Sequence, residues 1–375
     1  MSYAAMRDRS DKVQTTRVLH GGRVYEAARR WGIDPDDVID FSANINPLGP
    51  PPGVIAAAET SLRPSILRAY PDVQAFVSAL ADKHQLMPDE IVIGNGVAAL
   101  MFAIVRAILP RRVLLLEPAF GEYSRACNAV KAEVITWQLT QQDDFTPSFA
   151  SLISAVEKRQ FDLVILNSPH NPTGALYPIH ALQSLIRIAE ENKTSVMLDE
   201  AFIDYVPQSS LVSLAAKNCV LVVLRSLTKF FAIPGIRIGY AVSGARLAGR
   251  IREQIDPWPV STVALDAALA ALDQDEFGSE TRRQNALARE EFSGALRANG
   301  LQVFPSAANF LLVKLPRGSG AGLESFLAAE RILIRRCDSF RGLGDSYIRL
   351  AVRKSSDNLR LVCLLEKWFR GNVED

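Results

Sequence analysis

The sequence predicts an α/β protein with a large domain, built on a mostly parallel sheet flanked by helices, and a smaller α+β domain. Short apolar runs alternate with helical patterns between about residues 56 and 255, which is the pattern of strand–helix–strand units. Proline-rich segments at 46–53 and 257–259 indicate crossings between the domains. The chain has 375 residues, enough for two domains with a sizeable core.

These signals divide the chain into four parts. Residues 1–18 are expected to form a loose N-terminal arm, and residues 19–55 to contribute to the small domain and the site entrance. Residues 56–255 form the large domain and residues 256–375 the small C-terminal domain. The last part is expected to contain a helix, two strands and a closing helix, at Thr262–Leu272, Gln302–Val303, Phe310–Val313 and Ser356–Phe369.

Composition excludes several classes of function. A net charge of +1 gives no overall attraction to nucleic acid or to a membrane surface. The four cysteines form no CxxC pair and the four histidines no metal-ligand pattern, so we expect reduced thiols and no metal. No apolar run approaches the roughly 18 residues of a membrane span, and the polar N-terminus lacks a signal peptide. We therefore expect a cytoplasmic protein.

Lys229 is the most informative residue of the chain. It follows the apolar strand Val220–Leu224, and an amine buried at a strand end has a lowered pKa, so it can attack an aldehyde to form a Schiff base. Nearby hydroxyls of Ser226 and Thr228 and the guanidinium of Arg237 suit a phosphate group. The alternative is a lysine whose stem is buried and whose ammonium reaches solvent.

Two further polar residues follow apolar strands. Asn171 comes after one strand and Asp199 ends the next, 28 residues later and 30 residues before Lys229. Strand–helix–strand units of this length bring successive strand ends to one rim of a parallel sheet, where ligands bind. An amide, a carboxylate and a lysine match the needs of pyridoxal 5'-phosphate. The carboxylate keeps the pyridine nitrogen protonated, the amide bonds the phenolic oxygen, and the lysine binds the aldehyde.

With these motifs the chain resembles the fold-type I aminotransferase superfamily, and within it the histidinol-phosphate aminotransferase-like group, from about His20 to Arg353. Four local motifs are most similar to the threonine-phosphate decarboxylase branch, which serves cobalamin biosynthesis. These motifs are Leu19–Gly22, Asp40–Gly49, Leu198–Asp204 and Ile332–Leu343.

The resemblance implies further cofactor contacts. The main chain of Gly96, Val97 and Ala98, at the start of a helix, would hold the cofactor phosphate, and Phe120 would stack on the pyridine ring. An ordinary strand-to-helix turn and a buried core phenylalanine are the alternatives. Tyr70 matches the family tyrosine that reaches the phosphate of the neighbouring subunit, which implies a homodimer with shared active sites; an exposed loop tyrosine is the alternative.

One residue departs from the common aminotransferase pattern. Phe202 stands three residues after Asp199, where many aminotransferases carry a tyrosine that bonds the phenolic oxygen. That hydrogen bond is therefore absent, and Asn171 becomes the main neutral partner of the oxygen. The decarboxylase branch resembles this chain at the position, so the change favours that branch.

The substrate is inferred from cations. Arg349 matches the family's carboxylate-binding arginine, whose guanidinium can make a bidentate contact. A phosphorylated substrate needs more positive charge, for which Arg335 is the candidate and Arg336 the alternative, unless the two form a solvated surface pair. After the β-branched run before them, one should face inward and the other outward. The resemblance adds His20, Gly21, Gly22 and Asn44 at the site entrance.

Three functions remain open at this point. The first is decarboxylation of L-threonine O-3-phosphate to (R)-1-aminopropan-2-yl phosphate and CO2 for cobalamin biosynthesis. The second is an aminotransferase acting on histidinol phosphate or an aromatic amino acid, because the same residues serve both reactions. The third is a non-catalytic binding or assembly subunit of the same fold, which the intact lysine, aspartate, asparagine and arginine disfavour.

Overall fold

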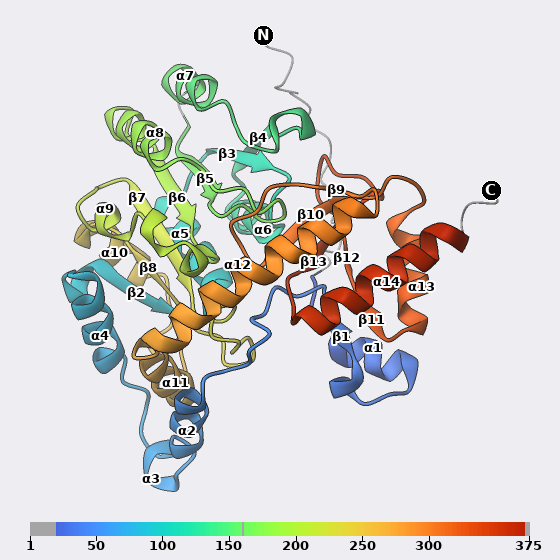
Figure 1. Ribbon diagram of the computed structural model, residues 1–375. Coiled ribbons are helices and arrows are strands. Elements are labelled where there is room, and N and C mark those ends of the chain that lie inside the picture. Colours follow the sequence, from blue (N-terminus) through green and yellow to red (C-terminus); the bar gives the residue numbers. More distant parts are fainter. Residues whose placement is uncertain (1–19, 160, 372–375) are drawn as a thin grey trace.

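The structure, a computed structural model, describes residues 20–159 and 161–371; the expected arm at residues 1–18 lies outside them. A seven-stranded sheet forms the centre of the large domain (Figure 1). Among the described residues, its last strand along the chain, β8, is antiparallel to both neighbours, and the other pairs are parallel. In spatial order the strands are β2 (Ile91–Gly94), β8 (Gly239–Val242), β7 (Leu221–Ser226), β6 (Ser195–Asp199), β5 (Leu163–Asn167), β3 (Arg112–Glu117) and β4 (Glu133–Gln138).

Helices cover both faces of this sheet, because side chains on a strand alternate between the faces. In β7, Val222 and Leu224 pack with α5 (Gly96–Ile108), α6 (Glu122–Ala129) and α10 (Ala245–Arg252). Leu221 and Val223 belong to the core on the other face. That core also contains side chains of α2 (Pro52–Thr60), α4 (Gln74–His84), α7 (Phe149–Arg159), α8 (Ile179–Glu191), α9 (Val212–Ala216) and α11 (Thr262–Leu272), while α3 (Pro64–Leu67) follows α2. The predicted α/β architecture is confirmed.

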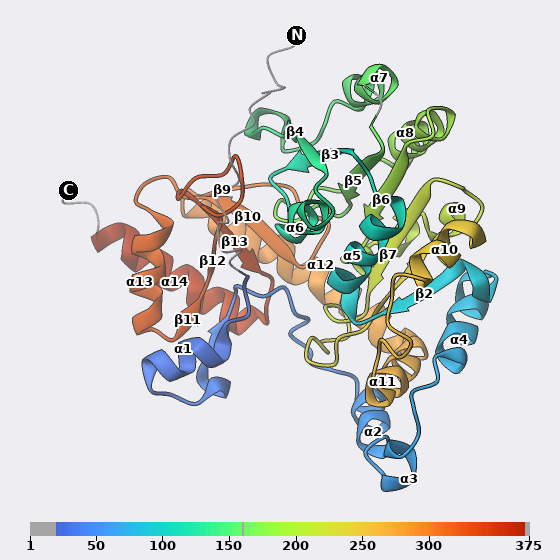
Figure 2. The same cartoon turned by 180° about the vertical axis from the view of Figure 1, so that it is seen from behind.

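The small domain combines both ends of the described chain. An antiparallel sheet has the order β12 (Arg335–Arg336), β13 (Tyr347–Ala351), β10 (Phe310–Lys314) and β9 (Gln302–Val303). The N-terminal β1 (Ile39–Asp40) pairs in parallel with β11 (Ile332–Leu333). Figures 1 and 2 both show α1 (Val24–Trp31) beside this region, which also holds α12 (Asp275–Ala298), α13 (Gly320–Ala329) and α14 (Ser355–Gly371).

Helix α11 follows the expected domain boundary at residue 256, but it packs in the core of the large domain. The helix lies against α2 and α4, and Ala267, Ala268 and Ala271 are buried in the large-domain core. Their small side chains allow the helices to approach closely. The change to the small-domain core falls instead along α12, where Phe292 and Leu296 are buried.

Asn46 links the predicted crossing at residues 46–53 to both domains. Its main-chain N–H donates to the carbonyl oxygen of Lys229 (3.1 Å). Its side-chain Nδ2 donates to the carbonyl of Phe230 (2.8 Å) and to Oγ1 of Thr281 on α12 (3.0 Å). The N-terminal segment is therefore hydrogen-bonded directly to the main chain that carries Lys229.

Candidate active site

The parallel register of β5, β6 and β7 brings the predicted residues to one rim of the large sheet. Asn167 at the end of β5 is level with Asp199 at the end of β6, and Asp199 is level with Leu224 of β7. Asn171 follows β5 and Lys229 follows β7, so both lie beyond the same rim. Lys229 and Asp199 interact electrostatically, which places their charges in one site.

Asp199 is held by hydrogen bonds to both carboxylate oxygens. Tyr123 donates its hydroxyl to Oδ2 (2.6 Å), and the main-chain N–H of Ala201 donates to Oδ1 (2.9 Å). Burial raises the pKa of Asp199, whereas these two hydrogen bonds and the charge of Lys229 lower it. Tyr123 was not predicted, because its partner Asp199 lies 76 residues away in the chain.

The charges of Asp199, Arg237 and Arg349 all act on the amine of Lys229. Its Nζ donates to Oγ1 of Thr228 (3.0 Å). Burial lowers the pKa of the Lys229 ammonium to about 8, and the positive charge of Arg237 adds to the effect, while Asp199 opposes it. A substantial fraction of the amine is therefore neutral near physiological pH, as a Schiff-base lysine requires.

A set of donors beside Lys229 could hold a phosphate. The first N–H groups of α5, from Gly96, Val97 and Ala98, have no partner within the helix and suit an anion. Ser226 Oγ and Thr228 Oγ1 lie 2.8 Å apart. Gly96 has φ +75°, and a Cβ there would lie 2.6 Å from Nη2 of Arg237, so the glycine lets this guanidinium reach the helix start. These groups fit a dianionic phosphate.

Aromatic rings line the neighbouring space. Phe120 is in edge-on contact with Tyr123 (ring centroids 5.8 Å apart, planes at 86°). The ring of His20 also contacts Phe120, with centroids 5.5 Å apart and planes at 52°. Phe202 packs edge-on against Phe310 (4.9 Å, 73°), so an apolar ring occupies the position at which a tyrosine would supply a hydroxyl. Phe202 therefore offers no hydroxyl to a ligand at this position.

Arg349 and Arg335 face each other on β13 and β12. They are directly paired in the antiparallel register, and both are buried. Arg349 donates from Nη1 to Oδ1 of Asn171 (2.6 Å) and from Nη2 to the carbonyl of Ser42 (2.8 Å). Arg335 donates from Nη2 to Oγ of Ser339 (2.8 Å). Because Asn171 uses Oδ1 for Arg349, its Nδ2 is the atom that can donate to a cofactor.

This arginine pair brings two positive charges close together. Like charges at directly opposed strand positions repel each other, and burial removes the water that would screen them. Burial and the charge of Arg335 lower the pKa of Arg349 to about 10, against the attraction of Cys337. Two such guanidiniums are suited to a ligand with two anionic groups.

Arg336 points away from this group. It pairs with Asp338, with Glu324 (3.4 Å) and with Asp345 (3.4 Å), and it is only half-buried. The structure therefore distinguishes the two candidates: Arg335 is on the side of Arg349, and Arg336 belongs to an ion-pair network near the surface.

The N-terminal segment reaches the same region. His20 Nε2 lies 3.0 Å from Oε1 of the buried Glu122. The N–H of Gly22 donates to Oγ of Ser42 (2.8 Å). The carbonyl oxygen of Ser42 accepts a hydrogen bond from Arg349. A Cβ on Gly21 would lie only 2.1 Å from this oxygen, so the close approach requires glycine. The carbonyl of Asn44 accepts from Asn309 Nδ2 (3.0 Å). Ser42 and Glu122 thus connect the entrance to the site, and neither was predicted.

Tyr70 is not brought to this group within one chain. It is 74% exposed and stacks on Trp258, with ring centroids 4.1 Å apart and planes at 16°. Its position between α3 and α4 makes it accessible to a second molecule.

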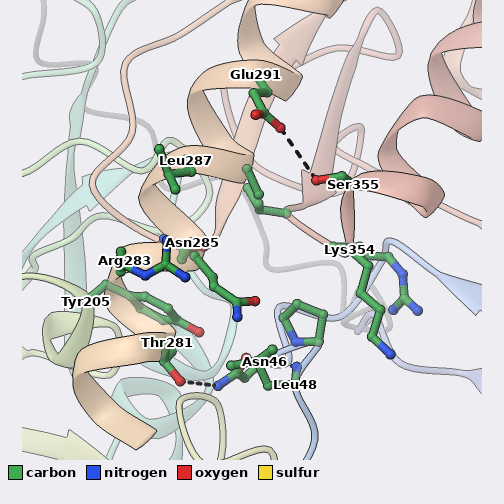
Figure 3. Close-up of a pocket in the computed structure, with 15 residues that line it drawn as sticks. Asn46, Leu48, Tyr205, Thr281, Arg283, Asn285, Leu287, Glu291, Lys354 and Ser355 are labelled. Atoms are coloured by element: carbon green, nitrogen blue, oxygen red, sulfur yellow. Dashed lines mark hydrogen bonds between the residues drawn. The ribbon is translucent and has the colours of Figure 1, made fainter. Parts of the chain in front are cut away.

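A separate cavity lies behind the Lys229 segment. It has a volume of about 260 Å³ and is lined by the crossing, by α12 and by the start of α14 (Figure 3). The hydrogen bond between Asn46 and Thr281 forms part of its wall, and Tyr205 points its hydroxyl toward this region. No residue predicted to bind cofactor or substrate is among its lining residues, so it is distinct from the site described above.

Within the described parts of the chain, no helix has the length and apolar character needed to cross a membrane, and no group of histidine, cysteine, aspartate and glutamate side chains could hold a metal ion.

Comparison with known proteins agrees with this geometry. The family "Aminotransferase class I and II" matches residues 36–364. A threonine-phosphate decarboxylase from Salmonella typhimurium is 36% identical, over 94% of this chain and 97% of the relative. The structure of a histidinol-phosphate aminotransferase from Clostridium acetobutylicum superimposes with a TM-score of 0.81 at 30% identity, covering 89% of this chain and 100% of that one. A histidinol-phosphate aminotransferase from Sinorhizobium meliloti, solved in complex with pyridoxal-5'-phosphate, shares the fold with a TM-score of 0.83 at 23% identity, over 96% and 99% of the two chains.

The repulsion between Arg335 and Arg349 predicts stabilisation by a divalent anion. Inorganic phosphate should raise the thermal unfolding midpoint of the cofactor-free protein more than sodium chloride of equal ionic strength, by about 2–4 °C per kcal/mol of binding free energy. The rise should be smaller in Arg335→Gln and unchanged in Arg187→Gln, whose side chain is exposed on α8. Equal rises in all three proteins would show that phosphate does not use Arg335.

Proposed function

Because the chain belongs to the aminotransferase class I and II family and uses pyridoxal 5'-phosphate as its cofactor, we propose that it decarboxylates L-threonine O-3-phosphate. The products are (R)-1-aminopropan-2-yl phosphate and CO2, in the service of cobalamin biosynthesis. The observation that carries the proposal is the buried, directly opposed pair Arg335 and Arg349. One amino acid with a carboxylate at one end and a phosphate at the other satisfies both guanidiniums.

The substrate groups correspond to separate parts of the site. Arg349 accepts the carboxylate, for which a guanidinium is geometrically matched. Arg335 binds the phosphate, and the segment with His20, Gly21 and Gly22 closes from the entrance beside Asn44, where Glu122 and Ser42 hold it. The substrate amine then lies toward Lys229, on the same side as Asp199.

The cofactor fits the remaining groups. Lys229 would supply the amine for its aldehyde, Asp199 would support its pyridine nitrogen, Asn171 would donate Nδ2 to its phenolic oxygen, and Phe120 would cover its ring. Its phosphate is held by the start of α5 and nearby donors, namely Gly96, Val97, Ala98, Ser226, Thr228 and Arg237. When bound, pyridoxal 5'-phosphate supplies an electron-accepting ring for the electron pair released at the substrate Cα.

The residues of this chain decide which bond at Cα breaks. Arg349 and Arg335 hold the two ends of the substrate, and their spacing fixes its rotation about Cα. With the carboxylate perpendicular to the ring plane, the bond between Cα and the carboxylate carbon breaks and CO2 leaves. Nζ of Lys229, with a pKa of about 8, is placed to return a proton to Cα, which completes the product amine.

Transamination of histidinol phosphate or an aromatic amino acid is the second candidate. The similarity to the aminotransferase from Clostridium acetobutylicum favours it, and the same lysine, aspartate and asparagine would serve. A non-catalytic subunit of this fold is the third candidate, and the intact Lys229–Asp199 arrangement argues against it. We expect the protein to work in the cytoplasm, as the composition indicates.

We infer a homodimer with shared sites, which the exposed position of Tyr70 supports. The exposed Tyr70–Trp258 stack is a rigid aromatic surface of the kind enriched at interfaces. A second copy of the chain, docked there, would receive Tyr70 at its cofactor phosphate, beside Arg237, which is also exposed.

The reaction is tested with L-threonine O-3-phosphate and pyridoxal 5'-phosphate, without any 2-oxo acid. CO2 and aminopropanol phosphate should form, and Arg335→Gln should raise KM for this substrate at least tenfold, because a charge-assisted contact is lost. Arg336→Gln is the matched control and should change KM little, since that side chain points to the surface. Formation of glutamate that depends on added 2-oxoglutarate, with no CO2 release, would instead identify an aminotransferase.

The role of Lys229 is tested by trapping. Reduction with borohydride in the presence of pyridoxal 5'-phosphate should tag Lys229, as located by peptide mass spectrometry, while Lys83→Ala should leave the tag in place. The pKa of Lys229 is lowered from 10.5 to about 8, so the amine is protonated below pH 8 and neutral above it. The trapping rate should therefore rise with pH and level off above about 8. In Lys229→Ala the tag and activity should be lost; a stoichiometric tag on another lysine of the wild-type protein would refute the assignment.

Shared sites are tested by mixing two defective variants. Tyr70→Ala lacks the donated residue and Lys229→Ala lacks the amine, so a mixed dimer has one intact site. Random exchange of subunits should restore up to about a quarter of wild-type activity per chain in a C2 dimer. Sedimentation should give a dimer for both variants. If mixing restores nothing although subunits exchange, Tyr70 does not act across an interface.

A further inference from the structure

Tyr123 is the only residue in the described site whose hydroxyl contacts the Asp199 carboxylate. It lies in the first turn of α6, is 2% exposed, and donates to Oδ2 at 2.6 Å. The same ring is in edge-on contact with Phe120. One side chain therefore connects the ring-covering phenylalanine to the carboxylate at the end of β6.

The hydrogen bond from Tyr123 stabilises the charged form of the Asp199 carboxylate. A buried carboxylate tends to take up a proton, because burial disfavours its charged form. A protonated Asp199 could not support a positive pyridine nitrogen. Donors that bond the charged form oppose this tendency, and Asp199 has two of them, Tyr123 and the N–H of Ala201.

The two donors also fix the orientation of the carboxylate. Ala201 bonds Oδ1 and Tyr123 bonds Oδ2, so rotation of the group would break at least one contact. Each oxygen keeps a lone pair for another donor. The pKa of the Tyr123 hydroxyl is raised well above its usual value by burial and by the charge of Asp199, so the group remains a donor throughout the working pH range.

We propose that Tyr123 is a positioning residue that holds the Asp199 carboxylate ionised and oriented toward the pyridine nitrogen of the cofactor. This inference rests on the proposed role of Asp199. Phe120, just before α6, would then cover the face of the cofactor ring, and Tyr123, in the first turn of α6, would act on its nitrogen through Asp199.

Tyr177 provides a matched control. It is also buried, at 1% exposure, and stacks on His170 with ring centroids 5.8 Å apart. Its hydroxyl is buried with no hydrogen-bond partner among the described residues. Replacing Tyr177 by phenylalanine therefore removes a buried hydroxyl near the site without removing a contact to Asp199.

The test is a titration of cofactor-free protein with pyridoxal 5'-phosphate, followed by visible absorbance and repeated from pH 6 to 9, a range of roughly three units around the usual working pH. Tyr123→Phe should raise the dissociation constant about tenfold to a hundredfold, as expected for loss of a hydrogen bond to a charged group. The loss should be greatest at low pH, because Asp199 then takes up its proton more readily. Tyr177→Phe should bind as the wild type does.

A double-mutant cycle tests whether Tyr123 acts through Asp199. In an Asp199→Ala background, Tyr123→Phe should have little further effect on the dissociation constant. An equal effect in both backgrounds, or wild-type binding by Tyr123→Phe, would overturn the proposal. Thermal unfolding of the cofactor-free variants shows whether they are folded. If Tyr123→Phe is not, Tyr123→His, which keeps a ring and a donor, replaces it: wild-type pH dependence supports the role, and affinity as low as in Asp199→Ala refutes it.

The outcome is separable from the identity of the substrate. Cofactor binding is measured with no amino acid present, so failure to decarboxylate L-threonine O-3-phosphate leaves the role of Tyr123 to be decided by the titration alone.

Discussion

Asp199 is buried at the carboxyl end of β6, and its negative charge sets the requirements for the groups around it. An isolated carboxylate in this position would be strongly unfavourable. The parallel register supplies Lys229 from the neighbouring strand, and α6 supplies a hydroxyl from Tyr123. These contacts depend on the order of the strands, because parallel strands end at the same rim and neighbouring strands bring their end residues close together. The strand order of the large sheet therefore supplies the partners that the buried charge of Asp199 requires.

The small domain contributes the opposite charge. Arg335 and Arg349 are held on neighbouring strands in a position that favours neither of them in the empty protein. The surrounding contacts, including Asn171 and the carbonyl of Ser42, fix Arg349 in advance. An anionic group beside both guanidiniums would reduce the repulsion between them.

The sequence predicted the elements whose patterns are local. The apolar runs ending at Asn167, Asp199 and Ser226 are the buried strands β5, β6 and β7, and the helix from Thr262 to Leu272 has the predicted bounds. The wrong domain assignment of that helix arose because an apolar helix does not reveal which core will cover it. Tyr123, Glu122 and Ser42 were missed for a related reason. Each acts through a partner far away in the chain, at Asp199, His20 and Arg349, and no spacing rule encodes such contacts.

The close approach of Arg237 to Gly96 links two positions that are 141 residues apart in the sequence. Any side chain at residue 96 would both strain a backbone of positive φ and occupy the space of the guanidinium. Neither residue can therefore be varied independently in a mutant library. A substitution of Gly96 would therefore have to be combined with a smaller side chain at residue 237.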